Sequence, residues 1–296
     1  MEELKWCEIG PLKTPRLEVL SQYLNSKGIQ NQFTFIEATD ANLKEKIAEA
    51  TAQKLSIRFH PKNIDQVSLN IKNNLRELEN LKAVDSLMFD EKKGYWPEIL
   101  FRDSLFEFLT HTVKNLDVMD KGFVIGTCGL ARASIAALIK LGFSKINITS
   151  KDDESALNLI KDFKEIFYNV QFEYTKRVDV TILPGTHGLV INTFSVLDSE
   201  DFPNEIYYFN FLKKGGLVID LVDVPPETPF LRIAQDIGAR VVRGYEAFGF
   251  YDLNWVLKVT GLKTDFDEYK QLLKTNLDQV AYDKNKIQTI LDEFQM

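Results

Sequence analysis

The stretch over residues 121–150 constrains the fold more than any other, because it joins an apolar run, a glycine turn, an amphipathic segment and a second apolar run. The two runs, FVIG and KINIT, have the length and composition of buried strands, and the segment between them has apolar residues at helical spacing. A strand, turn, helix and strand in this order form a βαβ unit of a parallel sheet. The turn brings backbone N–H groups to a helix N-terminus, which is where a dinucleotide pyrophosphate commonly binds.

The glycine spacing of this turn departs from the usual dinucleotide-binding pattern at one position. That pattern is Gly-x-Gly-x-x-Gly, or Ala at its end, and this chain has Gly126, Cys128 and Ala131, with Gly129 displaced by one residue. The second glycine normally leaves room for the pyrophosphate, whereas Cys128 adds a Cβ atom and a sulfur there. The turn therefore predicts either a reshaped cofactor site at these four residues or a strand-to-helix turn that serves only the packing of the sheet.

Cysteine and histidine content limits the chemistry of the chain. The 2 cysteines, Cys7 and Cys128, exclude a disulfide framework and are typical of a reducing compartment. The 3 histidines are far apart and form no zinc-binding spacing with the cysteines, so no metal site is expected. Cys128, at the predicted helix N-terminus, is either a thiol made reactive by the helix dipole or a small buried residue in a tight turn.

Length and charge favour a two-domain protein that acts on a small molecule. The 296 residues suffice for two domains, and 45% hydrophobic with 27% charged residues is typical of soluble globular proteins. The net charge of −7, with no clustered Lys and Arg, argues against a nucleic-acid partner. Because no segment has the character of a signal peptide or the length of a membrane span, we expect a cytoplasmic monomer or homodimer without a membrane partner.

Strand-like and helix-like segments alternate along the chain, which predicts an α/β protein with mostly parallel sheets. In the first part, strands are expected over 5–9, 32–37 and 54–59, and helices over 15–27, 42–51, 63–81 and 103–115. From residue 122 the expected strands are FVIG, KINIT, VQFEY, VTILP, LVINT, GLVIDLV and ARVVRG. The end of the chain is expected to be helical over 251–260 and 265–294, with an interruption around 282–285. It should dock through apolar positions at helical spacing, namely Leu272, Leu273, Leu277, Val280, Ile287, Ile290, Leu291 and Phe294.

Three segments of the second half resemble the shikimate dehydrogenase family. The first is GTCGLARASIAALIKLGFSKINITSK, which is similar to the family's glycine turn, helix and second strand. The second covers residues 216–261, where the D-x-V-x-x-P-x-x-T-P-x-L core matches the family without a gap. The third is LVINT, which is similar to the family's strand end near the nicotinamide.

The resemblance implies an NADP-dependent oxidoreductase that transfers a hydride between the nicotinamide and a hydroxylated ring acid. The substrate pair would be 3-dehydroshikimate and shikimate, as in aromatic amino acid biosynthesis, or a relative of it. The implied fold has an N-terminal α/β substrate-binding catalytic domain of residues 1–118, onto which C-terminal helices of residues 250–296 pack back. The other domain, residues 119–249, is expected to be a Rossmann-type NADP-binding domain with a doubly wound parallel sheet.

The residues after the second strand of that domain are expected to select the cofactor. Ser150 and Lys151 come first, and a basic residue there would accept the 2′-phosphate of NADP. Asp152 and Asp153 follow at once, and acidic side chains would instead suit the ribose hydroxyls of NAD. NADP is the preferred cofactor and NAD the alternative. The resemblance also implies three residues near the nicotinamide, namely Asn192, Thr193 and Gly244.

In the first half, most substrate-holding groups of the family are replaced. The family's I-G-x-P-x-x-x-S-x-S-P appears as IGPLKTPRL, with Thr14 for the second serine and Leu12 for the first. Its N-V-T-x-P-x-K appears as SIRFHPK, which keeps a lysine at Lys62 but has Arg58 for the threonine. Its A-V-N-T appears as AVDS, and its substrate-touching glutamine becomes a tyrosine. The implied substrate-binding residues are Thr14, Asp85, Ser86 and Tyr251.

The family's catalytic pair is that lysine and an aspartate before the interdomain helix. Lys62 is the expected proton donor, since a carbonyl held against the nicotinamide needs a donor within hydrogen-bond reach of its oxygen. Phe101 occupies the aspartate position, and Asp103, two residues on, is either a replacement or the N-cap of the helix that follows. The same replacements support an alternative in which the protein is a catalytically inactive family member that binds a ligand or regulates.

Overall fold

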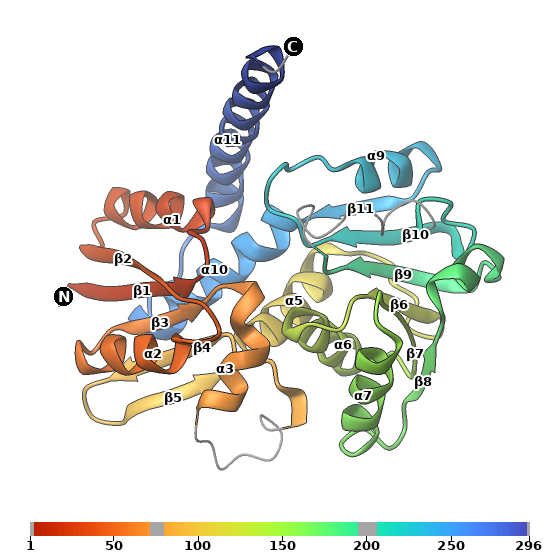
Figure 1. Ribbon diagram of the computed structural model, residues 1–296, viewed down its shortest axis with the longest axis horizontal. Helices are drawn as coiled ribbons and strands as arrows, with labels where there is room; N and C mark the ends of the chain where they lie inside the picture. Colours follow the sequence, from red (N-terminus) through yellow and green to blue (C-terminus); the bar gives the residue numbers. More distant parts are fainter. Residues whose placement is uncertain (1–2, 72–79, 195–205, 295–296) are drawn as a thin grey trace.

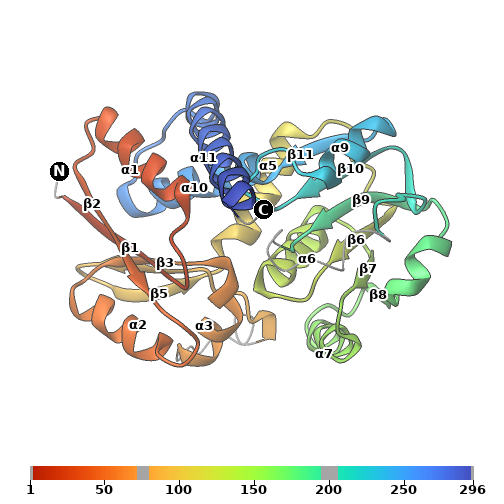
Figure 2. The ribbon, with the colours of Figure 1, turned by 45° about the horizontal axis from the view of Figure 1, so that its top comes forward.

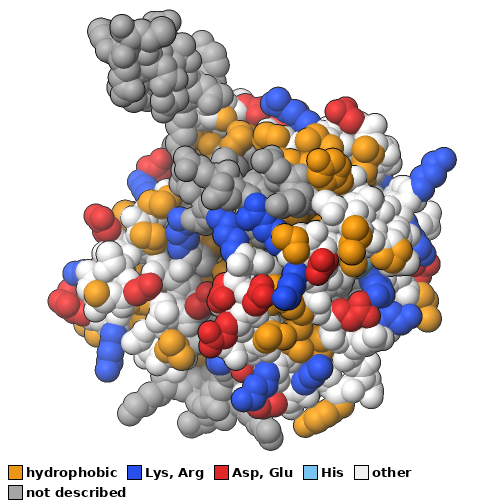
Figure 3. Space-filling model, turned by 45° about the vertical axis from the view of Figure 1, so that its right-hand side comes forward, with side chains coloured by type: hydrophobic (Ala, Val, Ile, Leu, Met, Phe, Trp, Pro, Cys, Tyr) orange, Lys and Arg blue, Asp and Glu red, His pale blue; other side chains and the backbone are white. Residues whose placement is uncertain are grey.

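The computed structural model describes residues 3–71, 80–194 and 206–294 and consists of two α/β domains, each built on one sheet (Figures 1 and 2). No helix in these described ranges combines the length and apolar composition that a membrane crossing requires. On the face shown in Figure 3, acidic and basic side chains are interspersed among uncharged ones. The two-domain α/β fold expected from the sequence is confirmed.

The first sheet has the order β2-β1-β3-β4-β5. Its strands are β1 (Leu4–Gly10), β2 (Asn31–Glu37), β3 (Ser56–Phe59), β4 (Ser86–Asp90) and β5 (Gly94–Glu98). The first three are parallel, whereas β4 and β5 form an antiparallel hairpin that the sequence reading missed. The helices of this part are α1 (Pro15–Ser26), α2 (Leu43–Ala52), the short 3-10 helix η1 (Pro61–Asn63) and α3 (Ile64–Asn70). The predicted helix over 63–81 thus has its first part in α3, and residues 72–79 lie outside the described residues.

The second sheet is parallel throughout, with the order β11-β10-β9-β6-β7-β8. Its strands are β6 (Lys121–Ile125), β7 (Lys145–Thr149), β8 (Gln171–Tyr174), β9 (His187–Asn192), β10 (Leu212–Asp220) and β11 (Arg240–Arg243). The associated helices are α6 (Gly129–Leu141), α7 (Asp153–Lys164), α9 (Pro229–Asp236) and the 3-10 helix η2 (Arg177–Ile182). The chain forms one half of the sheet as β6, β7 and β8, from the centre to one edge, and then forms the other half as β9, β10 and β11, from the centre to the opposite edge. This is the order of a doubly wound sheet, and the topological switch point lies between the two central strands, β6 and β9.

The predicted strand VTILP is wrong, because this segment ends η2 instead of joining the sheet. The amide of Asn210 donates hydrogen bonds to the carbonyl oxygens of Thr181 and Leu183, each at 2.8 Å. Carbonyl groups bonded in this way are not available for pairing with a neighbouring strand.

Helices α5 (Leu100–Thr112), α10 (Gly244–Thr260) and α11 (Phe266–Phe294) connect the two domains and complete the first one (Figure 1). Helix α5 packs against both α6 and α10, while α11 packs on α10 and α1. Leu273 and Leu277 of α11 are fully buried, which confirms that the C-terminal helices return to the first domain. The interruption expected around 282–285 is absent from the described helix, and the side chains predicted to dock at Ile287, Ile290, Leu291 and Phe294 lie outside the described residues.

Helix α5 begins three residues before the predicted start at Asp103. The Asp85 carboxylate, at the start of the β4 hairpin, accepts the N–H groups of Leu100 at 3.2 Å and Phe101 at 2.7 Å. A carboxylate that bonds the first free N–H groups of a helix stabilises its N-terminus. Asp103 is therefore not the N-cap, which is Ile99, but a first-turn residue.

Candidate active site

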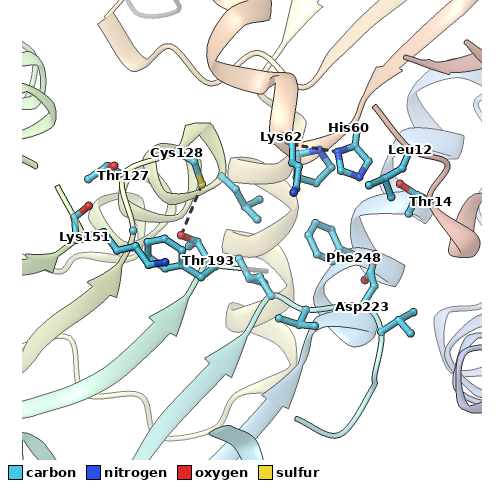
Figure 4. A pocket seen from close by; sticks show the side chains of 18 of the residues that line it. Leu12, Thr14, His60, Lys62, Thr127, Cys128, Lys151, Thr193, Asp223 and Phe248 are labelled. Carbon is cyan, nitrogen blue, oxygen red and sulfur yellow. Dashed lines mark hydrogen bonds between the residues drawn. The ribbon is translucent and has the colours of Figure 1, made fainter. Parts of the chain in front are cut away.

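A cavity of about 430 Å³ lies between the two domains, at the carboxyl ends of β6 and β9. One wall comes from the loops after β1 and β3, and the other from the turn after β6 and the loop after β7 (Figure 4). The loops after β9 and β10 also line it. Its size is ordinary for a ligand pocket, and its place at the switch point is where doubly wound sheets bind ligands.

Seven of the residues proposed from the sequence line this cavity: Thr14, Lys62, Gly126, Cys128, Ser150, Lys151 and Thr193. They come from both domains and face one space (Figure 4). Other lining side chains were not singled out as site residues, notably His60, Thr127, Phe194 and Phe248.

The turn after β6 can only be made by glycine at its first position. Gly126 has a φ of +118°, and a Cβ atom there would lie 2.2 Å from the Thr193 Oγ1 atom. The Thr193 hydroxyl donates a hydrogen bond of 2.7 Å to the Ile125 carbonyl and accepts one of 3.8 Å from the Cys128 thiol. The glycine turn and the end of β9 are thus tied together at the switch point, so the turn has a fixed shape.

Cys128 is the N-cap of α6, but it is not an activated thiol. Burial raises the pKa of its thiol, and the nearby carboxylate of Asp65 raises it further. These effects exceed the stabilisation of a thiolate that a helix N-terminus provides. The structure therefore gives no support to a reactive thiolate and agrees with the alternative of a small, largely enclosed residue.

The N-terminus of α6 touches the first domain through α3. A Cβ atom at Gly129 would lie 2.2 Å from the Ile64 Cγ2 atom, and the Gly129 N–H donates a hydrogen bond to the Asp65 carboxylate. Burial raises the pKa of Asp65 to about 6, although Arg132 and the Gly129 N–H oppose this rise. A carboxylate of the protein itself therefore occupies a helix end that favours anions, and the sequence reading gave no indication of it.

Ser150 and Lys151 lie at the other end of the cavity, beyond the turn. Asp152, which also lines it, caps α7 by accepting the N–H groups of Glu154 at 3.2 Å and Ser155 at 3.1 Å. The hydroxyl of Tyr174 donates to the carboxylate of Asp153. Both aspartates are thus engaged in contacts around α7, and Lys151 lines this end of the cavity as a basic side chain.

The residues expected near the nicotinamide lie around the end of β9, although only one of them lines the cavity. Thr193 does so, whereas the Asn192 amide is held by the buried Asp220 carboxylate at 2.8 Å. Gly244 lies behind the cavity wall, where a Cβ atom would be 2.2 Å from the Val222 carbonyl oxygen. Gly129 and Ala131, in α6, are buried and do not line the cavity either.

Lys62 and His60 lie side by side on the wall formed by the first domain (Figure 4). His60 follows β3 and is the N-cap of η1, where its Nδ1 atom accepts the Lys62 backbone N–H at 3.2 Å. Burial lowers the pKa of His60 to about 4, and the positive charges of Arg16 and Lys62 act in the same direction. The imidazole is therefore neutral near pH 7.

Behind this wall lies a buried charge cluster, which we define as Arg16, Arg58, Asp223 and Asp252. The Asp252 carboxylate, fully buried on α10, accepts hydrogen bonds from the guanidinium groups of Arg16 and Arg58. The Arg16 Nε atom is also 2.9 Å from the Asp223 carboxylate, which lines the cavity. The Arg58 guanidinium lies over the ring of Tyr251, 4.4 Å from its centroid. The guanidinium groups of Arg16 and Arg58 thus occupy space close to the cavity, and each is paired with the carboxylate of Asp252.

Three of the four implied substrate-binding residues do not line the cavity. Asp85, Ser86 and Tyr251 form a buried group in which the Ser86 and Tyr251 hydroxyls lie 2.8 Å and 3.3 Å from the Asp85 carboxylate. Burial raises the pKa of Asp85 to about 6, against the hydrogen bonds that it accepts. The large side chains of Arg58 and Phe101 surround this group, so it acts inside the first domain and not on the cavity surface.

Asp103 is separate from Lys62. Its carboxylate is 3.0 Å from Arg102 and 2.8 Å from Lys140 of α6, and it does not line the cavity. The structure therefore gives no support to Asp103 as the partner of the lysine. Its ion pairs instead connect α5 with α6.

The cavity residues fit a nicotinamide dinucleotide in three respects. The turn at Gly126 has a fixed shape at the cavity wall, Lys151 and Ser150 mark one end, and Lys62 faces the other. The Asp65 carboxylate, at the start of α6, opposes a pyrophosphate there. The site thus suits the cofactor once this carboxylate is displaced or neutralised.

No family model matches the chain. The shikimate dehydrogenase (NADP(+)) of Sulfolobus acidocaldarius is 34% identical over 123 residues, which cover 42% of this chain and 40% of that protein. The shikimate dehydrogenase (NADP(+)) of Clostridium perfringens is 26% identical over 226 residues, which cover 74% of this chain and 77% of that protein. The match spans 40% of the length of the Sulfolobus acidocaldarius protein and 59% of the length of the shikimate dehydrogenase (NADP(+)) of Prochlorococcus marinus subsp. pastoris, which is less than two thirds of each.

Among solved structures, the quinate dehydrogenase from Corynebacterium glutamicum in complex with NAD is similar over nearly the whole chain. The TM-score is 0.79 at 15% identity, and the match covers 93% of this chain and 100% of that one. The two-domain architecture is therefore shared in full, including the first domain, where the motifs of the sequence are most altered.

Proposed function

We propose that this protein, a relative of the shikimate dehydrogenases, is an NADP-dependent oxidoreductase. It would transfer a hydride between the nicotinamide and a hydroxylated ring acid, either shikimate and 3-dehydroshikimate or a relative of them. Residues 1–118 with 250–296 would form the substrate domain, and residues 119–249 the cofactor domain. The observation that carries the proposal is a single cavity at the switch point, with the glycine turn on one wall and Lys62 on the other.

Lys62 would move the proton of this reaction. When bound, the nicotinamide supplies or accepts the hydride at the substrate carbon. In the direction of reduction the Lys62 ammonium gives a proton to the carbonyl oxygen, and in oxidation the neutral amine takes the hydroxyl proton. Because the lysine stands on the first domain and the turn at Gly126 on the second, the two domains together bring donor and acceptor groups into one space.

For the cofactor, the turn from Gly126 to Cys128 would lie along the pyrophosphate, and Ser150 with Lys151 would hold the adenosine end. The capping contacts of Asp152 support NADP over NAD, because this carboxylate already accepts two N–H groups of α7. Lys151 is then the residue that distinguishes the two cofactors through the 2′-phosphate.

An inactive, ligand-binding protein is the competing function, and Phe101 is the observation that favours it. Phe101 is buried at the position of the family's catalytic aspartate, where it packs on Phe248 with ring centroids 5.1 Å apart. Such a protein would bind the cofactor without turnover, whereas the proposed enzyme oxidises shikimate or quinate with NADP⁺.

The first test is the thermal stability of the protein with and without cofactor. NADP⁺ at 100 times its Kd is expected to stabilise the folded state by about 2.7 kcal/mol, which raises Tm by about 5 °C or more. Differential scanning fluorimetry measures this shift. Lys151→Ala should reduce the shift with NADP⁺ and leave the shift with NAD⁺ unchanged, and the absence of any shift with both cofactors would remove the proposal.

Asp65→Asn is expected to tighten NADP⁺ binding about five- to tenfold at pH 7.5. The asparagine keeps the size of the side chain and its acceptor for the Gly129 N–H, but it removes a negative charge beside the pyrophosphate. The affinity is measured by isothermal titration calorimetry. An unchanged Kd would mean that Asp65 and the cofactor do not compete.

Measuring the NADP⁺ affinity of wild type and Asp65→Asn at lower pH tests whether the negative charge of Asp65 causes the difference. Since burial raises the pKa of Asp65 to about 6, wild-type Asp65 becomes neutral as the pH falls from 7.5 to 5.5. The ratio of wild-type to variant Kd should then fall toward one, and taking this ratio cancels the titration of the 2′-phosphate. The other groups that act on Asp65 (Arg132, Asp40 and Lys82) are the same in both proteins, as is Cys128.

A further inference from the structure

His60 occupies a position that no part of the proposed reaction has used so far. It lies on the cavity wall beside Lys62, and only Pro61 separates the two residues along the chain (Figure 4). Its backbone is fixed, because the His60 N–H donates to the Ile9 carbonyl at 3.0 Å. Its Cβ atom lies so close to β1 that a Cβ atom at Gly10 would approach it to 2.3 Å.

The hydrogen bonds of the ring determine which nitrogen carries the proton. The Nδ1 atom accepts the Lys62 backbone N–H at 3.2 Å, so in the neutral ring the proton is on Nε2. Among the residues that the structure describes, none forms a hydrogen bond with Nε2. The ring therefore has one N–H donor that the protein does not use, on a side chain that lines the cavity.

The neighbouring polar groups on this wall cannot supply that donor. The Thr14 hydroxyl donates to the Glu8 carboxylate, and the Asp223 carboxylate, paired with Arg16, only accepts. Leu12 and Phe248, which also line this end, are apolar. On the described part of this wall, Lys62 and His60 are thus the two side chains able to donate a hydrogen bond to a ligand oxygen.

We infer that the His60 Nε2–H group binds a substrate oxygen next to the one that exchanges its proton with Lys62. This inference rests on the proposed function and names the substrate feature that the site selects: a second hydroxyl or carbonyl oxygen on a carbon neighbouring the reacting one. His60 holds that oxygen as a hydrogen-bond donor and takes no part in the proton transfer, because its Nδ1 atom already accepts the Lys62 backbone N–H and its Nε2 atom already carries a proton.

Two conservative variants separate this role from a structural one. In His60→Asn the amide can still accept the Lys62 N–H, but the side chain is too short to place a donor at Nε2. In His60→Gln the amide nitrogen reaches about as far as Nε2. With shikimate or quinate as the probe and NADP⁺ as cofactor, His60→Asn is expected to raise KM about tenfold with a smaller change in kcat, and His60→Gln should stay within about threefold of wild type.

The pH dependence of kcat/KM provides a second readout. Between pH 6 and 9 both variants should keep the wild-type profile, since the pKa of His60 lies near 4, below this range. Loss of one limb of the profile in His60→Asn would assign the proton transfer to His60 and overturn the inference. Wild-type KM and kcat in His60→Asn would overturn it as well.

Direct binding distinguishes a failure of this inference from a failure of the proposed function. Calorimetry with shikimate or quinate in the presence of NADPH, with which these alcohols cannot react, should give a Kd about tenfold higher in His60→Asn, with an unchanged NADP⁺ affinity. If wild type binds NADP⁺ but both proteins bind the probe equally, only the role of His60 is wrong. If wild type binds neither cofactor nor probe, both proposals are wrong.

Discussion

Lys62→Ala is expected to lower kcat about 10³-fold while the Kd for NADP⁺ changes by less than threefold. General acid–base catalysis contributes roughly 10²–10⁴ to enzymatic rates, and Lys62 lies on the wall of the described cavity that the first domain forms. The lysine stands on η1, whereas the turn after β6 belongs to the second domain, so removal of the lysine side chain leaves the wall formed by the second domain intact. Steady-state oxidation of shikimate or quinate and calorimetry with NADP⁺ give the two numbers.

The matched control for this experiment is Lys54→Ala. Lys54 is an exposed lysine of the same domain, paired with Glu91 at 3.2 Å and remote from the cavity. Its removal should leave kcat, KM and NADP⁺ affinity unchanged. If Lys62→Ala retains more than a tenth of the wild-type kcat, the proton must come from another group and the assignment is wrong.

Asp252→Ala is expected to reduce the free energy of unfolding by about 3–5 kcal/mol, because it leaves two buried guanidinium groups without their shared partner. Asp252 is fully buried and accepts hydrogen bonds from Arg16, Arg58 and the Tyr269 hydroxyl, the last at 3.0 Å. These three partners belong to α1, β3 and α11, so one carboxylate on α10 joins most of the first domain. Urea denaturation followed by far-UV circular dichroism measures the loss.

Two further variants test the cause of this loss. Glu91→Ala, which removes the partner of the exposed Lys54, should have no measurable effect, since exposed ion pairs contribute little. The double variant Asp252→Leu with Arg58→Met removes one charge of each sign and should recover part of the lost stability. A loss below about 1 kcal/mol in Asp252→Ala would mean that water reaches the buried charge cluster.

The cofactor half of the site was predictable because its chemistry is local. The strand, the glycine turn and the helix that follow one another at residues 121–141 form the wall themselves, and Ser150 with Lys151 follow the next strand directly. The six parallel strands are also among the seven that the alternation of segments predicted for this domain. In this part of the chain the local sequence pattern and the tertiary structure agree, so a short motif was sufficient to predict which residues line the cavity.

The substrate half was less predictable because its contacts are long-range. Asp85 caps α5 from fifteen residues away, which moved the helix start and removed Asp85 from the cavity. Arg58 and Asp252 lie 194 residues apart, and nothing in either local pattern indicates that they pair. The β4–β5 hairpin did carry a local signal, since Asp90 accepts two turn N–H groups and Gly94 has a positive φ, but the charged residues between them obscured it.

The contact of Asp65 with Gly129 also bears on which anions this protein can accept. The Asp65 carboxylate already accepts the Gly129 N–H, so a free phosphate or sulfate would have to displace this carboxylate to bind at the start of α6. Under the proposed function, a dinucleotide would make the same displacement but would gain further contacts as far as Lys151. The internal carboxylate would therefore disfavour small free anions at this helix end more than it disfavours the larger cofactor.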